Sequence, residues 1–535
     1  MENYTNQYSI IYAKIDPAQP GLNFPQYALP QPASVAGDPD IMPDFPRLGS
    51  EMSFQSGLDA RQARWLKTSL AFLGIGIISF PIFTLVTALW VFFCIFSALV
   101  FWRGFLIFIG ICLRLTRRSS TQDFNADETL PIYTILVPLY QEAGIIPQLA
   151  QALSDLNWPS ARMDVQILLE SDDAETIEAA HAAAFPENTR LQIVPAGGPR
   201  TKPNALNFGL SEAFGQYITV YDAEDIPHPD QLQAAHQAFR SAARDLVCVQ
   251  APLIGDSRRS WLGAQWALEY AVQFGLLLPS LALYRMPLLI GGTSNHFRKD
   301  ALQALGGWDS WNVTEDADLG MRIARAGLVC GTISLPTHEE TPIVFGVWLG
   351  QRSRWIKGFI QTWLVMMRAP DKTLQQMGAV PFLIAQLCLG GAILAPLCHA
   401  PCVVMLIIVF VSPQLTIGVF GTGLLCTALL VGAASDVFSP GRLTLERTAA
   451  VFTRPFYWPL HSIAAYRAIW ELAKAPFFWA KTPHRPRDRK DIAACSTGLS
   501  ASVLPPASSR WASLHSLRWE PSGKRISVLT NFPGD

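Results

Sequence analysis

The sequence is short of charge. Only 16% of its residues are Asp, Glu, Lys or Arg, whereas roughly a quarter is usual for soluble domains. The charges nearly cancel, to a formal net charge of −1, so the overall balance gives no indication of a nucleic acid partner. The nine cysteines are scattered and include no CxxC pair, which leaves no sign of a disulfide framework or a zinc motif.

The charges are missing mainly from two long stretches. Residues 68–102 and residues 373–435 contain no Asp, Glu, Lys or Arg. Because about 20 apolar residues cross a bilayer, the first stretch predicts a transmembrane hairpin of two helices over residues 66–113. The second stretch predicts two or three spans within a C-terminal region of transmembrane and interfacial helices over residues 374–480.

Basic residues flank the first stretch on both sides: Arg61, Arg64 and Lys67 before it, and Arg114, Arg117 and Arg118 after it. Because basic loops stay in the cytoplasm, we expect a multi-pass protein of the inner (cytoplasmic) membrane with its polar domain on the cytoplasmic side. Residues 1–60 and the basic tail formed by residues 481–535 are expected to be disordered. The N-terminal segment lacks the apolar core of a cleaved signal peptide.

Residues 128–370 have a different pattern, in which short apolar runs alternate with amphipathic stretches. The runs predict buried strands at residues 132–137, 165–169, 191–194, 217–220 and 246–249. Helical patterns lie between them, near residues 143–156, 174–184, 203–214 and 229–243. This alternation predicts a mostly parallel sheet covered by helices on both faces, with its ligands beyond the carboxyl ends of the strands.

Residues 258–290 form a further apolar segment, with Glu269 inside it. The segment could be an amphipathic helix on the membrane surface. It could equally be a core helix of the polar domain.

Acidic residues follow three of the predicted strands, at Glu142, at residues 170–173 and at residues 222–225. Carboxylates at strand ends can hold Mg²⁺ or Mn²⁺ together with the phosphates of a substrate. The same acids could instead cap the helices that follow them.

Three other motifs carry groups suited to transfer chemistry. Lys202 stands at the start of a predicted helix, where a phosphate can bind, although it could equally be a solvated lysine at the tip of a loop. Residues 314–316, Thr-Glu-Asp, supply carboxylates that can take a proton from a hydroxyl, although they could also cap a helix. Residues 351–355, Gln-Arg-Ser-Arg-Trp, supply a guanidinium for a pyrophosphate and an indole for a sugar ring, although Arg and Trp near a membrane are often only anchors.

In this order and spacing, the motifs resemble those of the family-2 inverting glycosyltransferases, and within that family the cellulose-synthase-like membrane branch. The resemblance covers residues 60–480 and is carried by residues 137–142, 170–173, 202–207, 222–225, 292–298, 314–316 and 351–355. It implies an α/β GT-A (Rossmann-like) domain in the cytoplasm combined with α-helical transmembrane segments.

The resemblance also implies a role for each matching residue. Asp316 would be the catalytic base. The nucleotide sugar would be bound by Pro138, Tyr140, Glu142, Glu170, Asp173, Lys202 and Asp222. The acceptor and the pyrophosphate would be framed by Glu315, Gln351, Arg354 and Trp355. A Mg²⁺ or Mn²⁺ ion would be held by Asp222, Glu224 and Asp225.

The leading interpretation is therefore a processive synthase. It would use a UDP-sugar, with UDP-glucose as the first candidate, to extend a growing β-glycan. It would export the glycan through its own helices, and partner proteins could take part in the export. A second interpretation is a non-processive transferase that adds one sugar to a lipid acceptor in the membrane. A third is a catalytically silent protein that binds a nucleotide sugar or docks a partner.

Overall fold

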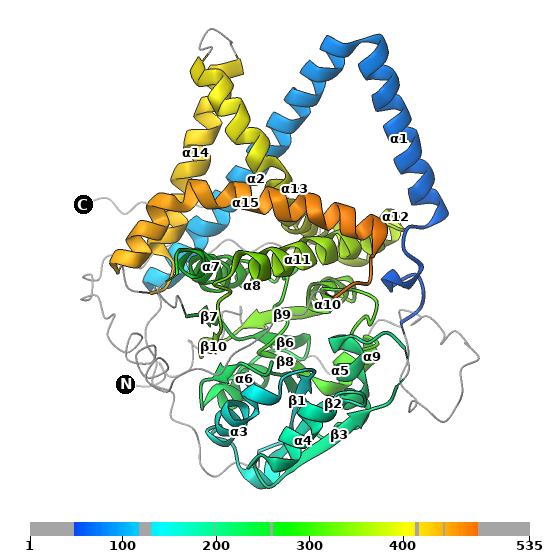
Figure 1. Ribbon diagram of the computed structural model, residues 1–535, viewed down its shortest axis with the longest axis vertical. Coiled ribbons are helices and arrows are strands. Elements are labelled where there is room, and N and C mark those ends of the chain that lie inside the picture. Colours follow the sequence, from blue (N-terminus) through cyan, green and yellow to red (C-terminus); the bar gives the residue numbers. More distant parts are fainter. Residues whose placement is uncertain are drawn as a thin grey trace, which may run out of the picture.

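The computed structural model describes residues 48–116, 130–196, 198–256, 260–411, 417–441 and 444–479. An α/β domain occupies one end of the molecule, and long helices project from the other end (Figure 1). The disorder expected for residues 1–47 and 481–535 lies outside the described residues.

A seven-stranded sheet in the order β3-β2-β1-β4-β8-β6-β9 forms the centre of the α/β domain. Its strands are β1 (Tyr133–Leu139), β2 (Met163–Glu170), β3 (Thr189–Val194), β4 (Tyr217–Val220), β6 (Leu246–Gln250), β8 (Asn295–Arg298) and β9 (Val329–Thr332). Only β8 runs antiparallel to its neighbours. A small sheet in the order β5-β10-β7 consists of β5 (Ile226–Pro227), β7 (Leu253–Gly255) and β10 (Thr337–Glu339).

Helices cover both faces of the large sheet (Figure 1). They are α3 (Ile146–Ser154), α4 (Ala174–Ala182), α5 (Lys202–Ser211), α6 (Gln231–Ser241), α9 (Lys299–Ala304) and α10 (Glu315–Arg325). Successive residues of β1 point to opposite faces, so Leu136 joins the core under α5 and α10, while Ile135 and Val137 join the core under α3 and α6. The α/β domain with a mostly parallel sheet and additional long helices, expected from the sequence, is confirmed.

The sequence pattern did not predict strand β8, because polar residues occupy its positions. His296 of this strand is fully buried, and its ring lies 2.7 Å from the Tyr133 hydroxyl. Burial lowers the pKa of His296 to about 3, so the ring is neutral at physiological pH. The polar pair fills the middle of the sheet where an apolar run would ordinarily be expected.

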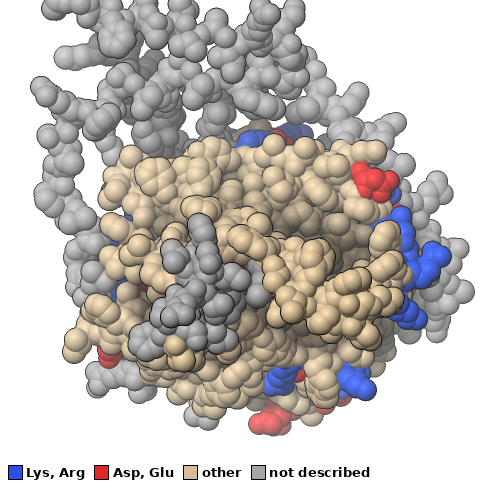
Figure 2. Space-filling view, turned by 90° about the horizontal axis from the view of Figure 1, so that it is seen from above, with Lys and Arg blue, Asp and Glu red and all other residues tan. Residues whose placement is uncertain are grey.

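The uncharged stretches form α1 (Ala60–Ser79), α2 (Pro81–Thr116), α13 (Ala379–Val411) and α14 (Ile417–Phe438). In the described part of the chain, four stretches are long and apolar enough to cross a membrane: Pro81–Thr116, Trp261–Leu283, Ala379–Val404 and Gly421–Phe438. Helix α1 is not among them, and its first half carries Arg61, Arg64 and Lys67. Seen from the end where the long helices project, the described surface has charged side chains only near its rim (Figure 2).

A layer of helices separates the sheet from the projecting helices (Figure 1). It contains α7 (Trp261–Val272), the π-helical turn Gln273–Leu277, α8 (Leu278–Leu283), α11 (Phe345–Met366), α12 (Pro370–Met377) and α15 (Leu445–Lys474). The segment that the sequence left open, residues 258–290, supplies Leu276 to a core shared with the sheet and Trp266 to a cluster with Tyr457 of α15. It is therefore a helix packed on both sides, and not one with a face lying open on the surface.

Residues 48–59 correct one expectation, because they are folded although the sequence predicted disorder there. Ser53 Oγ donates to Asp309 Oδ1 at 2.7 Å, and Phe54 N donates to Asp309 Oδ2 at 2.8 Å. Arg368 donates to the carbonyl oxygens of Ser53 and Gly57, each at 2.7 Å. The composition of the segment could not reveal partners that lie more than 250 residues away along the chain.

We expect Asp309→Ala to destabilise the protein by about 1–3 kcal/mol, because it strands the buried donors of Ser53 and Phe54. Asp309 also lies in the loop between α9 and α10, which leads to residues 315 and 316, so turnover should fall more than donor affinity does. Thermal unfolding and steady-state kinetics would measure both effects. Glu51→Gln is the control, since the exposed pair of Glu51 with Lys372 (3.5 Å) should contribute little. An Asp309→Ala protein with wild-type stability would contradict the prediction.

Candidate active site

A cavity of about 760 Å³ opens at the carboxyl ends of β1, β2 and β4 and continues between the projecting helices. At its sheet end the wall includes these residues predicted from the sequence: Pro138, Tyr140, Glu142, Glu170, Lys202, Asp222, Glu224, Glu315, Asp316, Gln351, Arg354 and Trp355. The fold therefore brings together motifs that are spread over more than 200 positions of the chain. Two predicted site residues, Asp173 and Asp225, are not part of this wall.

Three charged side chains converge around Gly292. Lys202 Nζ forms an ion pair with Asp222 and donates to the Gly292 carbonyl at 2.8 Å. A Cβ atom at position 292 would lie 3.3 Å from Asp316 Oδ2 and 3.6 Å from Lys202 Nζ. A glycine is therefore suited to this position, because any side chain would crowd the ammonium group and the carboxylate.

Helix α11 holds the loop that presents Glu315 and Asp316. A Cβ atom at Gly358 of α11 would lie 2.2 Å from Thr314 Oγ1, so the helix can approach the loop this closely only with glycine there. Gln361 of α11 accepts a hydrogen bond from Val313 N at 3.0 Å. Asp316 Oδ1 in turn accepts one from Ala317 N at 2.8 Å, in the first turn of α10. Asp316 thus lies inside the first turn of α10, after the N-cap residue Thr314, and also lines the cavity.

The two carboxyl groups at the start of α10 hold their protons more tightly than usual. Burial, and then the neighbouring Asp316, raise the pKa of Glu315 to about 7. Burial also raises the pKa of Asp316, against the lowering effect of Lys202 and Arg354. A buried carboxyl group with a raised pKa is a better proton acceptor once it is ionised.

We expect the transfer rate to rise with pH while Asp316 loses its proton, in a pH range above the ordinary one for an aspartate because burial raises the pKa of this carboxyl group, and to level off at higher pH. The sign follows from the base role, which needs the ionised form. Initial rates at saturating donor would measure this rise of the transfer rate with pH, and donor binding measured over the same pH range is the control. A rate that stays constant through this region would contradict the prediction.

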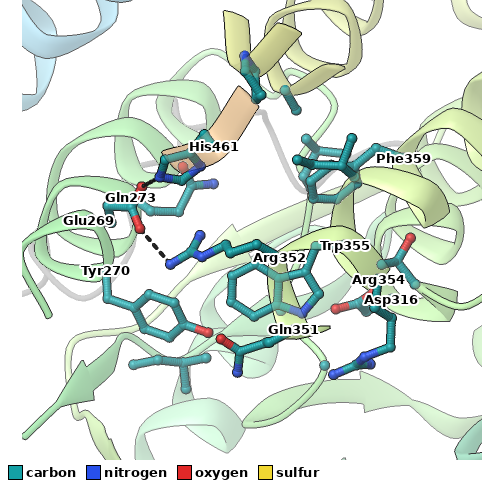
Figure 3. Close-up of a pocket in the computed structure, with 18 of the residues that line it drawn as sticks. Glu269, Tyr270, Gln273, Asp316, Gln351, Arg352, Arg354, Trp355, Phe359 and His461 are labelled. Atoms are coloured by element: carbon teal, nitrogen blue, oxygen red, sulfur yellow. Dashed lines mark ion pairs between the residues drawn. The ribbon is translucent and has the colours of Figure 1, made fainter. Parts of the chain in front are cut away.

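Arg354 points toward Asp316 (Figure 3). Its guanidinium carbon lies 4.5 Å from the ring centroid of Trp479, yet it has no hydrogen bond or ion pair with any described residue. The segment of Trp479 is itself tied to α11, because Gln361 Nε2 donates to Pro476 O at 3.0 Å and Lys357 Nζ donates to Phe478 O at 2.7 Å. A half-buried guanidinium that packs on a ring and has no hydrogen bond or ion pair among the described residues is suited to an anionic ligand such as a phosphate.

Trp355 is held by a buried polar network that the sequence did not predict. The guanidinium carbon of Arg352 lies 4.5 Å from the Trp355 ring centroid, and its Nη2 lies 2.5 Å from Glu269 Oε2. His461 lies 3.1 Å from the other oxygen of Glu269 (Figure 3). A lone acid inside an apolar segment was the signal for Glu269, but the sequence could not name its partner.

Asp225 and Asp173 are the two predicted site residues that lie outside the cavity wall. The Asp225 side chain is 1% exposed, and its Oδ2 accepts hydrogen bonds from Asp222 N at 2.7 Å and from Thr293 Oγ1. Asp173 accepts from Thr176 N at 3.3 Å as the cap of α4. Each of these carboxylates accepts a hydrogen bond from a backbone amide, and Asp225 Oδ1 is buried without a hydrogen-bond partner.

Asp222 and Glu224 are the acids of this motif that line the cavity. Burial, together with Asp222 and Asp225, raises the pKa of Glu224, and a cation bound there would relieve this crowding. No group of three or more potential metal ligands occurs among the residues described. Two carboxylates nevertheless fit Mg²⁺, which is commonly held by one or two carboxylates plus substrate phosphates.

Comparisons with known proteins agree with this geometry. Residues 217–435 match the family model described as glycosyl transferase family group 2. The β-monoglucosyldiacylglycerol synthase of Synechocystis sp. is 24% identical over 373 residues, which cover 66% of this chain and 75% of that protein. The cellulose synthase catalytic subunit of Komagataeibacter sucrofermentans is 25% identical over 248 residues, which cover 45% of this chain and 32% of that subunit.

Among solved structures, the mannosyltransferase PcManGT from Pyrobaculum calidifontis, in complex with GDP-mannose and Mn²⁺, aligns with a TM-score of 0.46 at 18% identity. That alignment covers 72% of this chain and 99% of the other. The chain spans about half the length of the first curated relatives it matches. The family match and the relatives support a family-2 glycosyltransferase, a class of transferase enzymes.

Proposed function

We propose that this protein is a membrane-embedded inverting glycosyltransferase. It uses a UDP-sugar, with UDP-glucose as the first candidate, and forms a β-linkage at the cytoplasmic face of the inner membrane. One observation carries the proposal: Asp316, Lys202 and Arg354 converge at one end of a cavity whose other end lies between apolar helices. A polar donor bound at the first end can therefore react with an acceptor that lies toward the membrane.

In the proposed reaction, a hydroxyl of the acceptor approaches Asp316, which takes its proton. The hydroxyl oxygen attacks the anomeric carbon of the donor while the bond from that carbon to the phosphate oxygen breaks. Both electrons of that bond leave with UDP, whose charge Arg354 and Lys202 balance. A single displacement of this kind inverts the anomeric centre, so an α-linked donor gives a β-linked product.

A divalent cation fits the acids of this site. Asp222 and Glu224 would hold Mg²⁺ or Mn²⁺, which would neutralise charge on the departing diphosphate. We expect Asp222→Ala to weaken cation-dependent binding of UDP by about tenfold or more, the loss of one charged ligand contact. Calorimetry with UDP, with and without Mn²⁺, would measure this effect. Asp230→Ala, at the start of α6 and remote from the cavity wall, is the control. Equal UDP affinity in the variant and the wild type would contradict the assignment.

A growing β-glycan is the first candidate acceptor, because Trp355 lines the cavity and an indole ring can stack on a sugar ring. A single sugar added to a lipid is the second candidate. The observation that favours it is the wall between the helices, where apolar side chains such as Leu99, Leu425 and Leu429 predominate.

Membrane vesicles containing the full chain, incubated with radiolabelled UDP-glucose and Mg²⁺ or Mn²⁺, would test the proposal. Products should be sized and digested with linkage-specific glucanases, with Asp316→Asn vesicles alongside. Long glucanase-sensitive product from the wild type alone would establish a processive synthase. Label in the lipid extract alone would establish single addition. No incorporation from any UDP-sugar, in protein that binds no UDP, would refute the proposal.

A further inference from the structure

The helix end of the cavity contains a cation that the transfer reaction does not use. Arg103 belongs to α2 and is the one charged residue between positions 68 and 113. It is an exposed residue, and it lines the cavity together with Arg454 and Trp458 of α15 and His399 of α13. Ionisable groups in such apolar helices are costly and usually mark a ligand or a partner.

Four other cations of the cavity wall each form an ion pair with an acidic side chain. Arg200 pairs with Asp172 at 2.5 Å, and Lys202 pairs with Asp222. Arg352 pairs with Glu269 at 2.5 Å, and Arg454 pairs with Asp436 at 3.4 Å. Only Arg354 and Arg103 form no ion pair or hydrogen bond with any residue in the described ranges.

The two unpaired arginines lie in different parts of the cavity. Arg354 is beside Asp316, where the diphosphate of the donor would lie. Arg103 is near Asp436, Arg454 and Glu269, which are its electrostatic neighbours, and both of these acids already have a cationic partner. The region around Arg103 therefore carries uncompensated positive charge before any ligand binds.

Beyond Arg103, the wall becomes apolar. Leu99 and Phe96 precede it by one and two turns on the same face of α2, and both line the cavity. Leu425 and Leu429 of α14 and Ala392 of α13 line it as well. A cation at the point where the cavity wall changes from polar to apolar residues is suited to a ligand with an anionic head group and a hydrocarbon tail.

We propose that the helix end of the cavity binds a phosphate-bearing lipid, with its phosphate at Arg103 and its chains against α2, α13 and α14. This inference rests on the proposed function, because it names the acceptor class of the same site. It favours the lipid acceptor, and it adds that the acceptor is recognised by its phosphate. A free hydroxyl on the head group of that lipid would then be the group that reaches Asp316.

The test compares two lipids that both offer a hydroxyl. The full chain would be placed in phosphatidylcholine nanodiscs containing either phosphatidylglycerol, which has a phosphate, or diacylglycerol, which has none. Native mass spectrometry would measure lipid binding, and labelled donor would measure transfer. We expect Arg103→Gln to weaken phosphatidylglycerol binding about tenfold or more, as the loss of a charge-assisted contact. Binding of diacylglycerol should not change.

Two further variants keep the test specific. Arg103→Lys should retain most of the binding, since the charge remains. Arg114→Gln removes the same charge from the same helix at a position that does not line the cavity, so it should bind phosphatidylglycerol as the wild type does. Equal losses in Arg103→Gln and Arg114→Gln would show surface attraction alone and would overturn the proposal.

Other outcomes would overturn it too. Unchanged phosphatidylglycerol binding in Arg103→Gln would show that Arg103 does not bind the phosphate of the lipid. Competition by glycerol phosphate as strong as that by the intact lipid would show a site for a soluble anion. UDP binding, measured on the same samples, separates this inference from the proposed function: UDP binding without lipid selectivity refutes only the lipid site, and loss of both refutes both.

Discussion

Asp316→Asn is expected to lower turnover by about two to four orders of magnitude, the usual contribution of a general base. The amide keeps the size of the side chain and can still accept from Ala317 N, as the carboxylate does at 2.8 Å. It cannot take a proton from the acceptor. Binding of UDP should therefore stay close to wild type, while kcat collapses. Single-turnover transfer and UDP calorimetry on the same preparation would measure the two effects.

Asp300→Asn is a matched control for this experiment. Asp300 accepts a hydrogen bond from the amide of the next residue, Ala301, at 2.8 Å in the first turn of α9, which is the same local geometry as that of Asp316. It does not line the cavity. If Asp316→Asn kept wild-type turnover, or if Asp300→Asn lost as much, the base assignment would be wrong.

The second large effect is expected at Arg354. Arg354→Ala should lower kcat by about two to three orders of magnitude, the range found when a donor aimed at developing charge is removed. The structure gives this residue no ion pair or hydrogen bond within the described ranges, so its removal should change thermal stability little. Arg354→Lys should recover part of the rate, because it restores the charge without the planar fork of donors.

Product-release and single-turnover kinetics would separate this effect from a loss of donor affinity. Arg162→Lys, at an exposed position before β2, is the control and should behave as the wild type does. A large drop in thermal stability for Arg354→Ala would contradict the prediction, since it would show a structural role.

The four-residue strand β9 (Val329–Thr332), which is also parallel, does not stand out in the sequence. Strands β1, β2, β3, β4 and β6 could be predicted, because they are short apolar runs that differ sharply from their surroundings. Strand β8 could not, because its residues are polar and are satisfied by partners such as Tyr133 from another strand. The gathering of acids at one edge of the sheet also followed from strand order. Which acids turn inward did not, because Asp225 and Asp222 differ by three positions and only the local hydrogen bonds decide their directions.

Long-range pairs account for the rest of what the sequence could not show. Arg352 was visible as part of a motif, and Glu269 was visible as an acid in an apolar segment, but nothing in either segment points to the other. The hydrogen bond from Ser53 to Asp309 is a similar case. The roles of the residues in the cavity wall and the domain boundaries remain predictions that the proposed experiments address.

The last described residues of the chain limit how the enzyme can be divided. After α15, residues 475–479 return to α11, where Pro476 and Phe478 accept hydrogen bonds and Trp479 packs on Arg354. A fragment truncated after α11 would keep every motif of the α/β domain and still have an incomplete active site. We therefore expect catalysis and membrane attachment to depend on each other, so that trimming the helices away should not yield an active water-soluble core.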